Sequence, residues 1–186
     1  LFQGMQMSLT RSLTRSLTRS LTRSLTGIIQ RYFIPLDPVA NQYYTIVSAW
    51  VPATDFTIEA EISTTTTANA NIFSGTLATT DAIVLRVNAA GTVTLSAYVG
   101  VTLQTAITSS ATVNDGKLRT VSATYVGTTA TLYIDGVSDG SATWALDGSQ
   151  DIKYVGQRAG GTNYFDGIIA NVKLTDSSNV VTEFEL

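Results

Sequence analysis

The chain has 186 residues, of which 44% are hydrophobic and 13% are charged, so it is long enough to bury a core of its own. It contains no cysteine, which excludes disulfides and thiolate metal sites, and no histidine, which excludes a Ser-His catalytic pair. Residues 1–31 carry five arginines and no acid, a charge of +5, whereas residues 32–186 carry −8. Such asymmetry is typical of an arm that has a partner of its own.

The first residues, Leu1–Gly4, match what a viral protease leaves when it removes an expression tag, and we interpret them as that remnant. Residues 5–27 then form an N-terminal arm. No stretch approaches the roughly 20 apolar residues of a membrane span, and no apolar segment with a cleavage site follows the first methionine. The sequence therefore predicts neither a membrane span nor a secretory signal.

The arm contains a strict four-residue repeat, in which Ser-Leu-Thr occurs five times with an arginine between successive copies. In a helix each repeat would advance by about 400°, so the leucines would drift around the cylinder. In an extended chain they share one face. A lone strand cannot bury such a face, so we expect copies of the arm to assemble, with a trimer as the first hypothesis. The residues expected to mediate this oligomerisation are Leu9, Leu13, Leu17, Leu21 and Leu25.

Other roles for the arm remain open. It could be a flexible tether, or it could dock on its own domain or on another protein. Its four arginines are not interleaved with aromatic residues, which is a weak pattern for nucleic acid, so we do not expect that partner.

Residues 28–54 are expected to connect the arm to a β-rich domain that spans residues 55–186. Phe56–Ser63 alternates apolar and polar residues, the pattern of a half-buried strand. No segment shows a helical period, and turn residues separate the short strands, so the pattern predicts an all-β fold, either a sandwich or a barrel. Further strands are predicted at Ala82–Val87, Thr92–Val99, Leu118–Val126, Ala130–Ile134, Ile152–Val155, Ile168–Leu174 and Val180–Phe184.

Turns are predicted from glycine-containing pairs. Asp135-Gly136 and Asp139-Gly140 favour turns because both residue types tolerate a positive φ. Residues 88–91 form a four-residue hairpin connection, and Gly167 permits a bend or bulge at the entry to a buried strand.

Three segments carry a family resemblance: Asp115–Gly127 (DGKLRTVSATYVG), Leu132–Gly136 (LYIDG) and Tyr164–Leu174 (YFDGIIANVKL). They resemble successive strands of laminin-G-like, concanavalin-A-like domains, in the same order and spacing, within about residues 55–175. The family often has Trp and His where Leu118 and Arg119 stand, and an acidic residue where Ala170 stands. The resemblance implies that the all-β fold is an antiparallel two-sheet jelly-roll sandwich, preceded by the extended N-terminal repeat arm, and that the domain is a binding module. A repetitive basic arm before such a domain is similar to bacteriophage virion and tail-fibre proteins.

Glu59 and Glu61 lie two residues apart in a predicted strand and so share a face. Some glucanases of the resembled superfamily use a Glu-x-Asp-x-Glu strand for acid/base hydrolysis. The central aspartate is absent here, and nothing indicates a carboxyl pKa raised by burial. We therefore interpret the pair as a solvated strand face and predict no catalytic residue.

Loop aspartates could supply oxygen ligands to Ca²⁺, which some laminin-G-like domains bind. Aspartate is also a common turn residue, and no Asp-x-Asp-x-Asp spacing concentrates the ligands. We therefore expect no metal site and no cofactor, with calcium kept as the alternative. The residues concerned are Asp115, Asp135, Asp139, Asp147, Asp151 and Asp166.

Sugar recognition uses a flat apolar ring face beside a few polar groups. Trp144, Tyr154 and Tyr164 lie near predicted loops, and Asn163 could donate amide hydrogen bonds to sugar hydroxyls. These four residues form the predicted ligand surface, with core packing as the alternative for each ring.

The sequence and the resemblance together favour a non-catalytic module that binds a cell-surface or extracellular glycan, or mediates adhesion. Its expected setting is a phage virion, as a tail-fibre or decoration component that joins other virion proteins through the arm. A purely structural virion protein and a glycan hydrolase or lyase are the alternatives.

Overall fold

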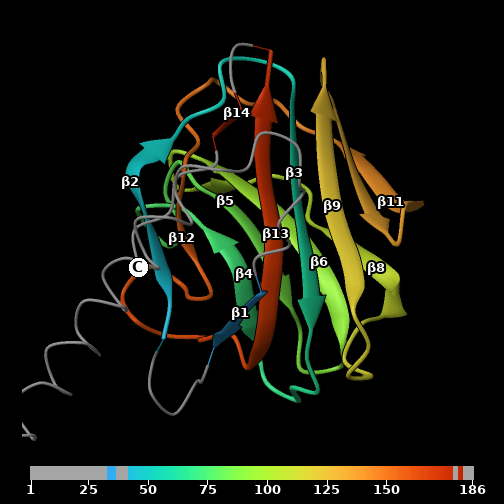
Figure 1. Cartoon of the computed structure of the whole chain (residues 1–186). Helices are drawn as coiled ribbons and strands as arrows, with labels where there is room; N and C mark the ends of the chain where they lie inside the picture. The colour runs from blue at the N-terminus through green and yellow to red at the C-terminus, as the bar shows by residue number, and fades with distance from the viewer. Residues whose placement is uncertain (1–32, 37–41, 178–179, 182–186) are drawn as a thin grey trace, which may run out of the picture. The chain divides into compact units, whose positions relative to one another are not determined.

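The computed structural model describes residues 33–36, 42–177 and 180–181, which form β-strands and connecting loops without a helix (Figure 1). Nothing in these ranges is therefore a helix long and apolar enough to cross a membrane. The strands are β1 (Phe33–Leu36), β2 (Tyr44–Trp50), β3 (Phe56–Ser63), β4 (Ala70–Ser74), β5 (Ile83–Val87), β6 (Thr92–Val99), β7 (Thr102–Leu103), β8 (Ile107–Thr112), β9 (Arg119–Val126), β10 (Thr129–Ile134), β11 (Val137–Thr143), β12 (Ile152–Val155), β13 (Gly167–Asp176) and β14 (Val180–Val181).

Two antiparallel sheets pack face to face. The front sheet of Figure 1 has the order β1-β13-β3-β9-β10-β11, with β14 paired to β13. The back sheet has the order β2-β12-β4-β5-β6-β7, with β8 paired to β6. Both sheets combine hairpins of consecutive strands with neighbours that are distant in sequence, such as β1 beside β13 and β2 beside β12, as expected for a jelly roll. The predicted all-β, two-sheet sandwich is confirmed for the described residues.

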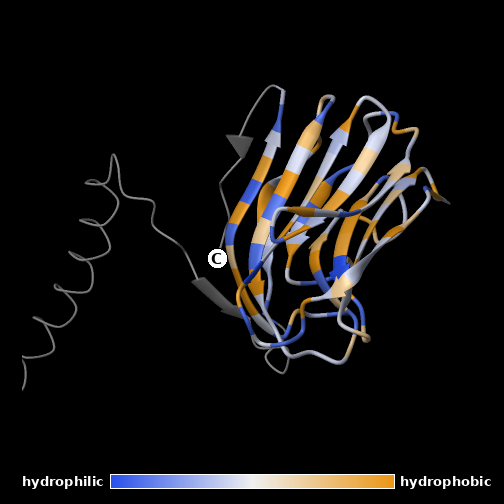
Figure 2. Ribbon diagram, turned by 90° about the vertical axis from the view of Figure 1, so that its right-hand side faces the viewer, coloured by the Kyte–Doolittle hydropathy of each residue, from blue (hydrophilic) through white to orange (hydrophobic). Residues whose placement is uncertain are grey.

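The core lies between the sheets and follows from the two-residue period of the strands. Phe56–Ser63 alternates buried and half-buried residues along its whole length, as predicted. Hydrophobic and hydrophilic positions also alternate along parts of several other strands (Figure 2). In the back sheet Ile83, Leu85 and Val87 are fully buried and point at the front sheet. Every second side chain therefore enters the core, and the others form the two outer faces.

The sandwich begins earlier in the sequence than residue 55. Within the segment expected to be a connection, β1 pairs with β13 and β2 pairs with β12, so each sheet takes an edge strand from it. Trp50, at the end of β2, is buried in the core. The sequence of this segment does not show a clear strand pattern, and its strands form because they pair with β13 and β12.

Of the two turns predicted at Asp-Gly pairs, the one at Asp135-Gly136 is confirmed and the one at Asp139-Gly140 is wrong. Asp135 and Gly136 both have a positive φ, 52° and 78°, and they form the tight turn between β10 and β11. Asp139 and Gly140 instead lie inside β11. The Asp139 carboxylate accepts hydrogen bonds from the backbone N–H groups of Ser110 and Ala111 in β8, so this residue ties β11 to the other sheet.

The predicted arm lies outside the described residues, and with it the leucines proposed for oligomerisation: Leu9, Leu13, Leu17, Leu21 and Leu25. The same holds for the last part of the strand predicted at Val180–Phe184, of which β14 is the described portion.

Candidate functional site: a tyrosine cluster beside the back sheet

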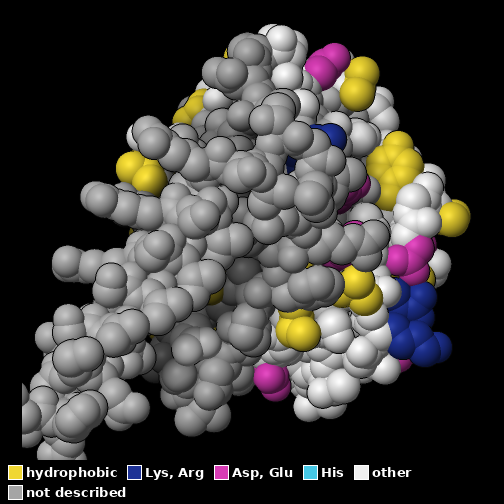
Figure 3. Space-filling model, viewed as in Figure 1, with side chains coloured by type: hydrophobic (Ala, Val, Ile, Leu, Met, Phe, Trp, Pro, Cys, Tyr) yellow, Lys and Arg dark blue, Asp and Glu magenta, His cyan; other side chains and the backbone are white. Residues whose placement is uncertain are grey.

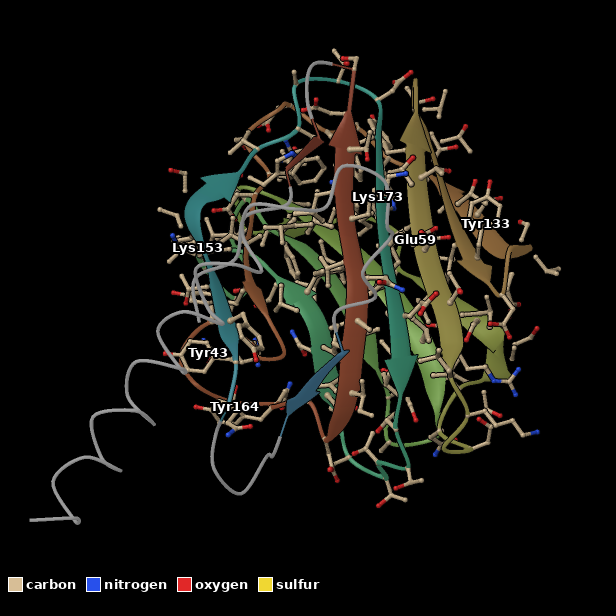
Figure 4. All side chains as sticks on the ribbon, viewed as in Figure 1. Tyr43, Glu59, Tyr133, Lys153, Tyr164 and Lys173 are labelled. Carbon is tan, nitrogen blue, oxygen red and sulfur yellow. The ribbon has the colours of Figure 1, made fainter. Side chains whose placement is uncertain are left out.

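Three tyrosine rings from separate parts of the chain meet at the surface. The ring centroids of Tyr43 and Tyr154 are 6.2 Å apart with the planes at 74°, and those of Tyr43 and Tyr164 are 6.3 Å apart at 43°. Tyr43 is 45% exposed and the other two rings are half-buried. Figure 4 shows Tyr43 and Tyr164 next to each other at the lower left of the domain. We call these three residues the tyrosine cluster.

Local structure explains how the cluster is held. Tyr43 immediately precedes β2, and Tyr154 lies in β12, which pairs with β2. Tyr164 lies on a small hairpin, residues 156–165, which is closed by a 2.8 Å hydrogen bond from the N–H of Phe165 to the carbonyl of Gly156. Phe165 is fully buried, so the hairpin is anchored in the core while Tyr164 stays at the surface.

Asn163 connects this hairpin to the back sheet. Its φ of 50° places it in the left-handed region, which asparagine tolerates better than most residues. Its backbone carbonyl accepts a 2.9 Å hydrogen bond from the N–H of Asn71 in β4. Its side-chain amide makes no hydrogen bond with the described residues, so it has its donors and acceptor left for a ligand.

The structure brings together three of the four predicted ligand residues, namely Tyr154, Asn163 and Tyr164. The fourth, Trp144, is only 1% exposed. Its indole N–H donates a 2.7 Å hydrogen bond to the carbonyl of Thr105, and its ring stacks on Tyr125 at 6.3 Å. Trp144 is thus a core residue, and its ring face is not available at the surface.

The sequence prediction missed Tyr43. The adjacent tyrosines at 43 and 44 are visible in the sequence, but they fall in the segment that was expected to be a connection. Only the pairing of β2 with β12 brings Tyr43 beside Tyr154.

A separate cleft of about 380 Å³ opens beside the connection between β2 and β3. Its lining includes the rings of Phe56 and Tyr125 and the polar side chains of Asp55, Asp147 and Gln150. Hydrogen bonds from the Ser149 hydroxyl, from Gln150 and from the backbone lower the pKa of the Asp147 carboxyl to about 2. The cleft is therefore anionic at neutral pH, and no basic side chain lines it.

The two glutamates considered for catalysis lie on the outer face of the front sheet. Both are half-buried and share a face, as predicted. The Asn171 amide donates a 2.8 Å hydrogen bond to Glu61, and Figure 4 shows Glu59 beside Lys173, its cross-strand partner. Neither carboxylate lines the cleft described above.

Most of the loop aspartates accept hydrogen bonds from protein donors. Asp115 and Asp135 both bind the guanidinium of Arg119, at 2.6 and 2.8 Å. Asp151 accepts from the backbone N–H of Thr76, at 2.9 Å. In the described part of the chain, no three acidic side chains gather in a group that could hold a metal ion. Where grey atoms do not cover the face drawn in Figure 3, charged side chains of either sign form only small separate groups.

The fold defines a two-sheet jelly-roll sandwich, and comparison with known families agrees. Residues 38–183 match the laminin G model of the concanavalin A-like lectin/glucanases superfamily, and the chain belongs to this family. A comparison with curated protein sequences finds no match.

Solved structures share the fold at low sequence identity. Domains LG4-5 of the mouse laminin alpha1 chain superpose with a TM-score of 0.60 and 15% identity, covering 84% of this chain and 44% of that one. A heptameric SAP-like pentraxin from Limulus polyphemus gives 0.55 and 15%, covering 71% and 68%. A candidate carbohydrate-binding protein from Bacteroides ovatus gives 0.55 and 18%, covering 72% and 41%. The chain thus spans less than half of the laminin and Bacteroides chains.

Proposed function

We propose that this protein is a non-catalytic module that binds a glycan at the tyrosine cluster. The observation that carries the proposal is the meeting of Tyr43, Tyr154 and Tyr164 at the surface, beside the amide of Asn163. Aromatic rings offer the apolar face that stacks on a sugar ring, and a nearby amide can bond its hydroxyls. The likeness to a candidate carbohydrate-binding protein from Bacteroides ovatus is compatible with this function.

The absence of catalysis is part of the proposal. Hydrolysis of a glycosidic bond needs two carboxyl groups that flank the bond in a cleft. Glu59 and Glu61 lie on an outer sheet face, and Glu61 is engaged by Asn171. We expect no release of reducing ends from a polysaccharide panel. Release that disappears in Glu59→Gln or Glu61→Gln would contradict this part.

The setting that we propose for this protein rests on the sequence of the arm. We propose that the protein acts in adhesion as a phage virion component, outside the cell, and that its arm joins further copies or other virion proteins. The support is the strict Ser-Leu-Thr repeat and the charge of +5 in residues 1–31, against −8 in the rest. A trimer remains the first hypothesis for the oligomer.

The test is a glycan array followed by calorimetric titration of the best glycan. Tyr43→Ala and Tyr164→Ala should each weaken binding about fivefold, because one stacked ring contributes roughly 1 kcal/mol. Tyr133→Ala is the matched control, since Tyr133 is a half-buried tyrosine on β10 in the front sheet, far from the cluster in Figure 4. Binding that survives both substitutions, or falls equally in the control, would contradict the assignment.

We also propose that binding needs no metal ion. The aspartates that could have served as calcium ligands mostly accept hydrogen bonds from the protein itself. Affinity for the array-selected glycan should therefore be the same with EDTA and with added calcium. A loss of binding in EDTA that calcium restores would show that the alternative is correct.

A further inference from the structure

A polar row crosses the outer face of the back sheet and begins next to the tyrosine cluster. In β4, β5, β6 and β8, Asn71 pairs with Arg86, Arg86 with Thr94, and Thr94 with Thr108. The flanking residues Leu85 and Leu95 point into the core, so the row points away from it. The row meets the cluster through the hydrogen bond between the Asn71 N–H and the Asn163 carbonyl.

Arg86 is the one charged side chain in this row, and no acidic side chain in the described part of the chain pairs with it. Its Nε donates a 3.1 Å hydrogen bond to the side chain of Asn88, and it forms no ion pair with the described residues. Its partners in register, Asn71 and Thr94, are uncharged. The terminal nitrogens of the guanidinium make no hydrogen bond with the described residues, and they have the fork geometry that matches a carboxylate.

Asn71 gives an independent indication of a missing partner. Its side chain is 1% exposed, yet neither its amide nitrogen nor its amide oxygen has a hydrogen-bond partner. Buried polar groups are almost always paired, and an unpaired one costs about 1–3 kcal/mol. Because Asn71 lies directly opposite Arg86, both side chains project from the same face and reach the same region.

The rest of the row is pre-organised. The Asn88 amide, which holds Arg86, also donates to the hydroxyls of Thr92 and Thr94, at 3.0 and 2.8 Å. The hydroxyls of Thr94 and Thr108 are 2.9 Å apart. This network fixes the guanidinium and lines up hydroxyl groups beyond it, so a ligand group would meet a site that needs little reordering.

We infer that the glycan bound by this protein is acidic, and that the carboxylate of one sugar unit pairs with Arg86 beside Asn71. The inference rests on the proposed function, because the tyrosine cluster would stack a neighbouring unit of the same chain. Arg86 and Tyr154 lie two strands apart, at least about 10 Å, so the ligand is an oligosaccharide. A single carboxylate fits one arginine, whereas the charge of −8 on residues 32–186 would repel a densely charged polyanion.

The experiment uses the full chain and a panel of uronic-acid and sialic-acid oligosaccharides, each as the free carboxylate and as its methyl ester. The wild type should bind at least one carboxylate about tenfold more tightly than its ester, since a charge-assisted hydrogen bond contributes that much. Arg86→Gln should remove the preference and keep the ester affinity. Arg86→Lys should keep part of the preference for the carboxylate, because the positive charge remains while the paired donors of the guanidinium are lost. Tyr43→Ala should weaken both forms equally.

Lys173→Gln is the matched control, since it removes one positive charge from an exposed position of the front sheet. Equal affinity for the two forms, or a preference that survives Arg86→Gln, overturns the inference while the proposed function stands. A preference lost equally in Lys173→Gln also overturns it, because the effect would then come from net charge. If no member of the panel binds in either form, the inference fails, and the glycan array decides the proposed function separately. Thermal unfolding of each variant excludes misfolding as the cause.

Discussion

The aromatic side chains of this domain fall into two groups, those exposed at the surface and those buried in the core. Tyr43 is 45% exposed and Trp144 is 1% exposed, although both lie at the ends of strands or in loops. The exposed ring can stack on a ligand, whereas the buried one fills the core and satisfies its indole N–H with the carbonyl of Thr105.

Trp144→Phe should therefore lower stability and leave glycan binding unchanged. The substitution removes a buried hydrogen bond and leaves the Thr105 carbonyl unpaired, at a cost of about 1–3 kcal/mol in the free energy of unfolding, measured with urea. Trp50→Phe is the control, because the indole N–H of Trp50 donates to none of the described residues and only packing is lost. Reduced glycan affinity in Trp144→Phe, at unchanged stability, would return Trp144 to the ligand surface.

The lowered pKa values of Asp147 and Asp139 predict that the protein loses stability in acid. The pKa of Asp147 is lowered to about 2, first by the Ser149 hydroxyl, and that of Asp139 is lowered, first by the Ser110 hydroxyl. In the unfolded chain both titrate near about 3.9. A lowered folded-state pKa stabilises the protein above the unfolded value, and this contribution is lost as the pH falls from about 4 to 2.

The free energy of unfolding should accordingly decline over that range, by a modest amount because both groups are solvent-screened. Asp147→Asn should flatten this part of the profile, whereas Asp166→Asn, whose carboxylate binds none of the described residues, should not. A profile with the same slope in Asp147→Asn and wild type would contradict the assignment.

At the scale of elements, the pairing of the edge strand β2 with β12 is irregular. Ile152 pairs with Trp50, and Tyr154 pairs with Thr45. Between these two pairs the register shifts, because β12 advances by fewer residues than β2, so β2 bulges. The Lys153 ammonium donates to the carbonyls of Ile46 and Val47, at 2.5 and 2.8 Å. Lys153 lies on β12, the neighbour of the edge strand β2. The bulge in β2 hinders pairing with a foreign strand at this edge of the back sheet.

The entry to β13 depends on the absence of a side chain at Gly167. Its φ is +138°, and a Cβ there would lie 2.1 Å from the Ser63 carbonyl oxygen in the adjacent strand. Gly167→Ala should cost more than about 3 kcal/mol or prevent folding, because the clash is with backbone that cannot move alone. Gly160→Ala is the matched control: it also has a positive φ, but no atom lies within 4 Å of its Cβ, so only about 1 kcal/mol should be lost. Equal urea midpoints for the two variants would refute the clash.

At the scale of the whole molecule, a basic repeat precedes an acidic sandwich in one chain. The irregular pairing of β2 makes this edge of the back sheet a poor site for assembly. Assembly would therefore come from the arm, where aligned copies could pair backbones and bury the repeated leucines together.

Shortening the chain so that it begins at Gly27 should convert an oligomer into a monomer, as measured by light scattering. Glycan affinity per site should stay the same, while binding to a glycan-coated surface should weaken through loss of multivalency. Replacing only the arginines of the repeat with lysine is the control, since it keeps the charge and the leucines. If the full-length and shortened chains both give a monomer mass, the arm is a tether or docks elsewhere.

Local patterns in the sequence were enough to predict the class of fold, although not the edge strands β1 and β2. Alternation in Phe56–Ser63 placed four side chains in the core, and the Asp135-Gly136 pair placed a turn, because both follow from local backbone geometry. The order of strand motifs from Asp115 to Leu174 predicted the family, and residues 38–183 match it.

Only the tertiary structure decided which surfaces are open to a ligand. A two-residue period says that neighbouring side chains face opposite ways, but not which face another layer covers, so Trp144 was predicted at the surface and lies in the core. Tyr43, Tyr154 and Tyr164 meet because β2 pairs with β12 and the hairpin folds back beside them. Asn71 and Arg86 become neighbours through the pairing of β4 with β5. Pairing between strands distant in sequence is a nonlocal choice of register, and no single segment encodes it.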